Sequence, residues 1–162
     1  MTRRSLAVPA VLALAGMPPA GAQERLLPLD EAGFNRLVAS HKGKVLLVNF
    51  WATWCEPCRA EMPALARIQS SLGAKGFRLV TVSADEPEDE PAARQFLRSA
   101  KVAGPFYIKR AENDARFTPA IEAKRSGALP FSVLYDRSGK RVRAFTGEVD
   151  LKALEAIVRK LL

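Results

Sequence analysis

The apolar positions of this chain form two kinds of pattern, short unbroken runs and stripes at helical spacing. One such run covers residues 45–51, Val-Leu-Leu-Val-Asn-Phe-Trp, and the stretch Phe-Arg-Leu-Val-Thr-Val-Ser at residues 77–83 is a second long strand candidate. Short apolar runs rich in β-branched residues are typical of strands that are buried on both faces. We therefore expect both stretches to be long strands of a sheet, the first of them buried, with further strands at residues 106–108 and 141–146 and one that has Pro130 at its head.

Helical spacing appears between the predicted strands. Asp30 and Asp150 each precede an apolar stripe and have the side chain of a helix N-cap. The stripe after Asp150 predicts a closing helix that covers the sheet. Strands that alternate with helices predict an α/β fold. The two stripes consist of Phe34, Leu37 and Val38, and of Leu151, Leu154, Ile157, Val158 and Leu161.

The chain has two cysteines, Cys55 and Cys58, and they follow the first apolar run at the start of a helical pattern. A Cys-x-x-Cys pair at a strand-to-helix turn can close a small disulfide. The first sulfur then lies at the helix N-terminus, where free N–H groups and the helix dipole stabilise a thiolate. The thiolate is the attacking species in thiol–disulfide exchange, so the pattern predicts redox chemistry.

Three other interpretations of the cysteine pair remain open. A structural zinc site needs about four ligands, and the chain offers two cysteines and the single His41. A disulfide that serves only as a brace closes a very short loop and removes little entropy from the unfolded chain. Two buried free thiols are disfavoured because Pro57 and the helix start place the pair at the edge of an element. These considerations favour the redox interpretation.

Residues 50–61, Phe-Trp-Ala-Thr-Trp-Cys-Glu-Pro-Cys-Arg-Ala-Glu, resemble the active site of the membrane-associated periplasmic thioredoxins of the TlpA/ResA type. That group includes the cytochrome c maturation reductases. The resemblance runs from about Leu26 to the C-terminus. It implies a thioredoxin-like fold, with a central mixed β-sheet flanked by helices and an inserted helix and short strand. The strand of residues 106–108 and a helix at residues 114–125 are the candidates for the inserted part.

The resemblance also indicates which acidic side chain exchanges protons with the cysteines. Ordinary thioredoxins have a buried aspartate at the strand position that Asn49 occupies here, and Asn49 cannot titrate. Glu61 is the candidate for the replacement, since a helix brings it to the same face as Cys58, three residues earlier. In TlpA/ResA-type proteins the matching glutamate couples to the proton chemistry of the cysteines. The alternative is a solvated surface glutamate. Asn49 is expected to be a satisfied core amide with no catalytic part.

Other residues are expected to shape the site. Trp54 would form a flat rim beside Cys55, and Pro57 suits the first turn of a helix. Glu56 places a negative charge near Cys55, which disfavours the thiolate and makes the dithiol a better reductant. By resemblance, Pro130 would be a cis proline against the cysteine pair, and Leu129 before it would offer backbone groups to the substrate chain.

The N-terminal residues have the pattern of a signal peptide. Arg3 and Arg4 precede an apolar stretch, and Ala20-Gly21-Ala22 is a small-x-small cleavage signal. We expect residues 1–22 to be removed on export to the periplasm and residues 23–162 to form one thioredoxin-like domain. A membrane tether and twin-arginine export are alternatives. Loss of the two arginines lowers the formal net charge from +8 to +6; the basic residues are scattered, and no motif predicts nucleic-acid binding.

The expected function is reduction of protein disulfides. Cys55 attacks the substrate, and Cys58 resolves the mixed disulfide with help from Glu61. The resemblance implies a membrane thiol transporter as electron donor and apocytochrome c thiols as one substrate class. We also expect a monomer with no metal or other cofactor. A disulfide oxidase or isomerase with the same site is the main alternative. A thiol peroxidase is another, and a copper-site assembly protein is disfavoured because no histidine follows the cysteines.

Overall fold

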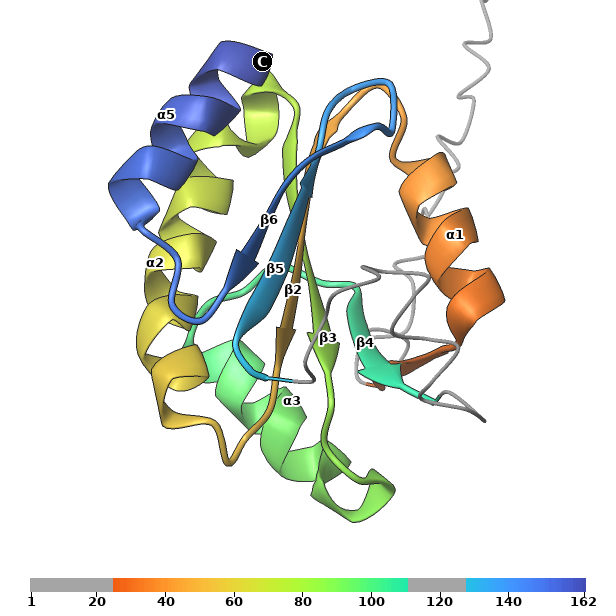
Figure 1. The fold of residues 1–162 in the computed structure, drawn as a ribbon. Helices are drawn as coiled ribbons and strands as arrows, with labels where there is room; N and C mark the ends of the chain where they lie inside the picture. The colour runs from red at the N-terminus through yellow and green to blue at the C-terminus, as the bar shows by residue number, and fades with distance from the viewer. Residues whose placement is uncertain (1–24, 111–127) are drawn as a thin grey trace, which may run out of the picture.

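The computed structural model describes residues 25–110 and 128–162, in which six strands form one sheet. Their spatial order is β1-β4-β3-β2-β5-β6, so the two long predicted strands, β2 and β3, lie at the centre (Figure 1). The strands are β1 (Leu27–Leu29), β2 (Val45–Trp51), β3 (Phe77–Ser83), β4 (Phe106–Lys109), β5 (Phe131–Tyr135) and β6 (Arg141–Thr146).

The sheet is mixed. β2 is parallel to β3, and β4 runs parallel to both β3 and β1. β5 is antiparallel to β2 and to β6. Parallel strands present their carboxyl ends at the same edge of a sheet, where ligands of α/β proteins commonly bind. The loop after β2, which carries the cysteines, therefore lies beside the loop after β3.

Helices cover both faces of the sheet (Figure 1). One core cluster joins the sheet to α2, α3 and α5, and a second joins its other face to α1. All seven residues of β2 are buried as a result, which explains its unbroken apolar pattern. The helices are α1 (Glu31–Ser40), α2 (Glu56–Leu72), α3 (Glu90–Ser99) and α5 (Leu151–Leu161).

The predicted helix caps are confirmed. The Asp30 carboxylate accepts a hydrogen bond from Gly33 N at 2.6 Å and begins α1. The Asp150 carboxylate accepts from the backbone N–H groups of Lys152 and Ala153 and begins α5. Each cap satisfies N–H groups that the first helical turn leaves without intrahelical partners.

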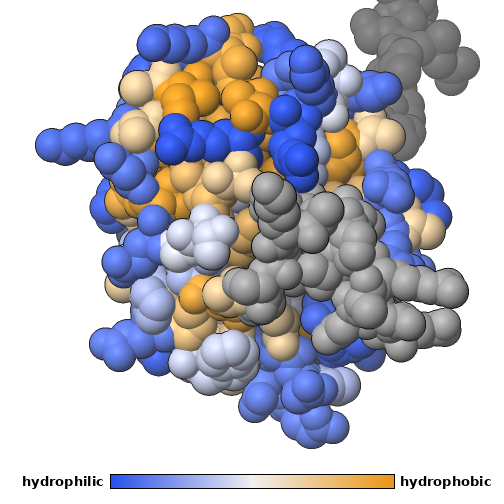
Figure 2. Space-filling view, in the orientation of Figure 1, coloured by the Kyte–Doolittle hydropathy of each residue, from blue (hydrophilic) through white to orange (hydrophobic). Residues whose placement is uncertain are grey.

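The short strand predicted at residues 106–108 is also confirmed, since β4 pairs with both β3 and β1. The helix predicted at residues 114–125 and the signal peptide predicted at residues 1–22 lie outside the described residues. Among the helices of the described ranges, none combines the length and the apolar character needed to cross a bilayer. The face seen in Figure 2 carries hydrophilic and hydrophobic side chains side by side.

Candidate functional site

The two cysteines lie where β2 ends and α2 begins. They form a disulfide with their Cα atoms 5.3 Å apart. Cys55 is the N-cap residue of α2, and its Sγ accepts a hydrogen bond from Cys58 N at 3.3 Å. The first sulfur therefore occupies the helix N-terminus, as the sequence predicts. A thiolate formed there on reduction would be stabilised by the free N–H groups and the helix dipole.

The two cysteine residues differ in their exposure to solvent. Cys55 is 5% exposed, whereas Cys58 is fully buried. Trp54, directly before Cys55, is 69% exposed and is among the few large apolar side chains that face solvent in the described residues. Only Cys55 is placed to meet a sulfur of another molecule, and Trp54 forms an apolar rim next to it. Trp51 is instead fully buried in the core.

Glu61 is not a solvated surface residue. It is 6% exposed on the inner face of α2, one turn after Cys58. Its Oε1 accepts a hydrogen bond from Asn49 Nδ2 and its Oε2 accepts one from Val149 N, each at 3.0 Å. Burial raises the pKa of Glu61 above its usual range, although both hydrogen bonds act in the opposite direction. A buried carboxyl with a raised pKa is suited to proton transfer near neutral pH.

Asn49 differs from its expected role as a fully satisfied core amide. Nδ2 donates to Glu61 and also to Ser132 Oγ at 2.9 Å, but Oδ1 has no hydrogen-bond partner among the described residues. Asn49 is opposite Ser132 in the β2–β5 register, and Glu61 of α2 contacts Asn49. Sequence reasoning missed Ser132 and Val149 and gave Asn49 no part in the site, because these contacts join segments that are far apart in the chain.

Leu129 and Pro130 lie at the head of β5, beside the end of β2. Phe131, the next residue, pairs with Phe50 of β2. The Leu129–Pro130 peptide bond is cis, which matches the expectation from the resemblance. Pro130 is buried, and its carbonyl accepts a hydrogen bond from Gly147 N at 2.9 Å. Leu129 is partly buried against both core clusters.

Glu56 and Pro57 occupy the first two positions of α2, as predicted. Glu56 is exposed and Pro57 is half-buried. A proline here costs no intrahelical hydrogen bond, because its missing N–H belongs to the first turn. Among the described residues, no three His, Cys, Asp or Glu side chains form a group that could hold a metal ion.

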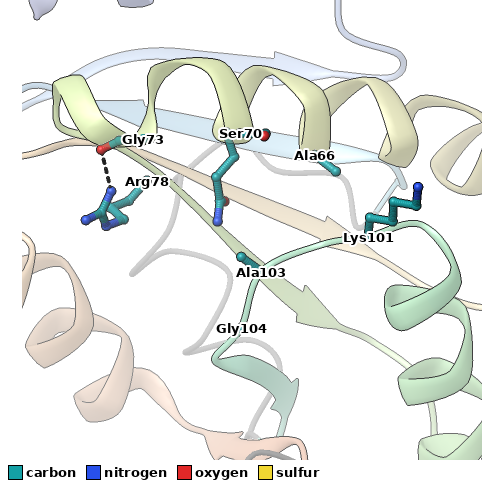
Figure 3. A pocket seen from close by; sticks show the side chains of 8 residues that line it. Ala66, Ser70, Gly73, Arg78, Lys101, Ala103 and Gly104 are labelled. Carbon is teal, nitrogen blue, oxygen red and sulfur yellow. Dashed lines mark hydrogen bonds between the residues drawn. The ribbon is translucent and has the colours of Figure 1, made fainter.

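A pocket of about 410 Å³ lies beside the C-terminal half of α2, away from the cysteines. Figure 3 shows Arg78 at one end, where Nη1 donates to the Gly73 carbonyl at 2.8 Å, and Lys101 at the other end. Neither cysteine lines this pocket. Exchange with a protein disulfide needs an accessible sulfur, so the surface around Cys55 is the candidate site.

Comparison with known proteins shows the family to which the chain belongs. A model of the AhpC/TSA family matches residues 26–158. A thiol-disulfide oxidoreductase ResA of Bacillus cereus is 33% identical over 120 residues, which cover 74% of this chain and 65% of that protein. ResA of Bacillus subtilis is 32% identical, over 74% of this chain and 63% of that protein. The matched region therefore spans slightly less than two thirds of these relatives.

Solved structures show the same fold. The thiol:disulfide interchange protein of the thioredoxin family from Chlorobium tepidum TLS superposes with a TM-score of 0.63 and 26% sequence identity. The superposition covers 76% of this chain and 83% of that one. The thioredoxin-like fold expected from the sequence is thereby confirmed.

Proposed function

We propose that this chain, which belongs to the AhpC/TSA family, is a thiol-disulfide oxidoreductase that reduces disulfides in protein substrates. The Cys55–Cys58 disulfide at the start of α2 is the observation that carries the proposal. Cys55, the less buried of the two residues, directly follows the exposed Trp54, where another protein chain can approach. The relatives named thiol-disulfide oxidoreductases support the same activity.

The reaction is a pair of exchanges. In the reduced protein, the Cys55 thiolate attacks a substrate disulfide, forms a mixed disulfide and releases one substrate sulfur as a thiolate. Cys58 then attacks Cys55 Sγ, which releases the second substrate sulfur and forms the Cys55–Cys58 disulfide present in the structure. Two electrons pass to the substrate. A donor dithiol must return them by reducing this disulfide before the next turnover.

Glu61 is the proposed proton acceptor for the second exchange. Cys58 is fully buried, so its thiol needs a base inside the protein before it can attack. Glu61 lies on the same face of α2, and its raised pKa brings its basicity closer to that of a thiol. The proton of Cys58 passes to the Glu61 carboxylate, and Asn49 and Val149 hold that carboxylate in place.

Substrate binding is assigned to the surface beside Cys55. Trp54 contacts the substrate chain, and the backbone at Leu129 and Pro130 pairs with it. The negative charge of Glu56 disfavours the Cys55 thiolate and thereby the reduced form of the pair. The dithiol is therefore a stronger reductant of its substrates. Pro57 fixes the helix start between the cysteines.

The proposal includes export to the periplasm after removal of residues 1–22. A reductase in an oxidising compartment needs a dedicated electron supply, and a membrane thiol transporter is the proposed donor. Apocytochrome c thiols are one proposed substrate class, and the protein is proposed to act as a monomer.

Insulin reduction driven by dithiothreitol tests the activity. We expect the residue 23–162 protein to accelerate the reaction and Cys55→Ser to abolish the acceleration. Cys58→Ser should accumulate a mixed disulfide that mass spectrometry detects. Equal rates for the unsubstituted protein and Cys55→Ser would contradict an oxidoreductase function. A hydrogen peroxide turnover assay with the same proteins tests the thiol peroxidase alternative.

The reduction potential tests the direction of electron flow. Equilibration of the Cys55–Cys58 pair against glutathione and dithiothreitol buffers should give a value well below about −200 mV for a reductase. A value near about −120 mV, typical of a strong disulfide oxidant, would instead assign the site to disulfide donation.

A further inference from the structure

We propose that Asp85 is a positioning residue for the exchange reaction, because its carboxylate holds the loop that presents Trp54 and Cys55. This inference rests on the proposed function. Asp85 follows β3 and is 3% exposed. Its Oδ1 accepts hydrogen bonds from Thr53 N at 2.9 Å and from Thr53 Oγ1 at 2.7 Å. Its Oδ2 accepts hydrogen bonds from Ser83 Oγ at 2.6 Å and from Thr53 N at 3.1 Å.

Thr53 lies in the middle of the short connection between β2 and α2. The connection is fixed at its start by Ala84 N, which donates to the Trp51 carbonyl at 2.8 Å. At its end, Cys55 N donates to the Ala52 carbonyl at 3.1 Å. Asp85 binds both the backbone and the side chain of Thr53 between these two points. The residue that follows is Trp54, whose side chain has no comparable burial to fix it.

The Asp85 carboxylate and the loop depend on one another. A buried carboxylate is costly unless hydrogen bonds replace its hydration. Within the described residues, the donors to this carboxylate are the N–H and O–H groups of Thr53 and the hydroxyl of Ser83. The Asp85 backbone is also held, since its N–H donates to Ser83 Oγ at 3.0 Å and its carbonyl accepts from Arg110 Nη1 at 3.4 Å. The backbone of Asp85 is thus held in place while its carboxylate binds the loop.

This arrangement affects protein substrates more than small disulfides. A protein chain must contact Trp54 and the surface near Cys55 together, so it depends on the loop conformation. A small disulfide needs only the Cys55 sulfur, which the N-cap of α2 positions separately. Without the hydrogen bonds to Asp85, the loop samples several conformations. Binding of a protein substrate must then restore a single loop conformation, and the free energy that this ordering costs appears as a higher KM.

Asp85→Asn tests the inference, with Asp136→Asn as the matched control. The Asp136 carboxylate also accepts three hydrogen bonds within its loop, from Ser138 and Lys140, but it follows β5 at the opposite end of the sheet. We expect Asp85→Asn to lower kcat/KM for insulin about tenfold or more, mainly through KM, and to change the rate with oxidised glutathione by less than about twofold. Asp136→Asn should change neither rate.

Thr53→Val provides a second route, since it removes the hydroxyl donor and leaves the Asp85 carboxylate and the Thr53 backbone N–H in place. It should shift KM for insulin in the same direction by a smaller factor, and Thr53→Ser should restore the original value. Equal losses with insulin and with glutathione, or no loss with either variant, would overturn the positioning role. Should Asp85→Asn fail to fold, the Thr53 pair decides alone. Failure of the proposed function itself would give a different result, because the unsubstituted protein would then reduce insulin no faster than Cys55→Ser.

Discussion

Asn49 Nδ2 donates a 3.0 Å hydrogen bond to Glu61 Oε1, so that a buried amide on β2 meets a buried carboxylate on α2. The strand position of Asn49 is the one at which ordinary thioredoxins, by resemblance, have an aspartate. In this chain the helix supplies the carboxylate and places it against the strand side chain. A buried acid is thus present next to position 49, although position 49 itself cannot titrate.

Glu61→Gln should slow resolution of the mixed disulfide. The variant keeps the size of the side chain but cannot accept the Cys58 proton, and general base catalysis typically contributes ~10²-fold or more. We expect the second exchange to slow by about that factor and to lose its dependence on pH near the raised pKa of Glu61, which burial causes. Stopped-flow measurement of thiol release from a preformed mixed disulfide at Cys55 gives this rate.

The control for this experiment is the reactivity of the Cys55 thiolate, which is the attacking species of the first exchange. Alkylation of Cys55 by iodoacetamide does not involve the Cys58 proton, so its rate should change little in Glu61→Gln. Equal resolution rates in the variant and the unsubstituted protein, across the whole range from weakly acidic to weakly basic pH, would falsify the proton-transfer role.

Glu61 should also make stability depend on pH. Burial raises the pKa of Glu61 in the folded chain above the value of about 4.3 that an unfolded chain gives. The folded chain therefore binds more protons between these two values, and the free energy of unfolding falls as pH rises through that interval. Above the raised pKa this loss is complete. Urea unfolding from about pH 4 to about pH 8 should show this decrease, and Glu61→Gln should remove it.

The sequence predicted the elements of the fold well because each has a local signal. The buried strand β2 is an almost continuous apolar run, Asp30 and Asp150 precede their helices, and the pair Cys55 and Cys58 follows a strand. The surroundings of Glu61 could not be predicted in this way. Its partner Val149 is 88 residues away, and the contact exists only because α2 and the start of α5 lie side by side in the folded chain.

Asp85 illustrates the same limit. Its sequence context is an acidic, proline-bearing stretch, which is typical of a solvated loop. The structure buries its carboxylate against Thr53, 32 residues earlier, since the parallel pairing of β2 and β3 brings their carboxyl ends together. No local pattern distinguishes this buried aspartate from the exposed acids that follow it.

Asn49→Asp should place two carboxyl groups in direct contact. The hydrogen bond from Asn49 Nδ2 now lowers the pKa of Glu61, and the substitution replaces this donor by a second acid. Two carboxylates at this distance cannot both ionise cheaply, so the pair should titrate in two separated steps, with the higher apparent pKa above that of Glu61 alone. NMR titration of the carboxyl carbons measures both steps. Two overlapping titrations at ordinary values would contradict the contact.

Asp150→Ala should weaken both α5 and the site. The Asp150 carboxylate caps α5 through Lys152 N and Ala153 N, and the preceding residue Val149 donates to Glu61 Oε2. Loss of an N-cap costs about 1 kcal/mol, which for a domain of this size corresponds to a fall in Tm of roughly 2–4 °C. The hydrogen bond from Val149 lowers the pKa of Glu61, so a frayed helix start should raise that pKa further.

Asp30 caps a helix on the other face of the sheet, so Asp30→Ala is the control: it should lower Tm comparably and leave the Glu61 titration unchanged. A Glu61 titration that also stays constant in Asp150→Ala would show that the α5 cap does not hold Val149 in place.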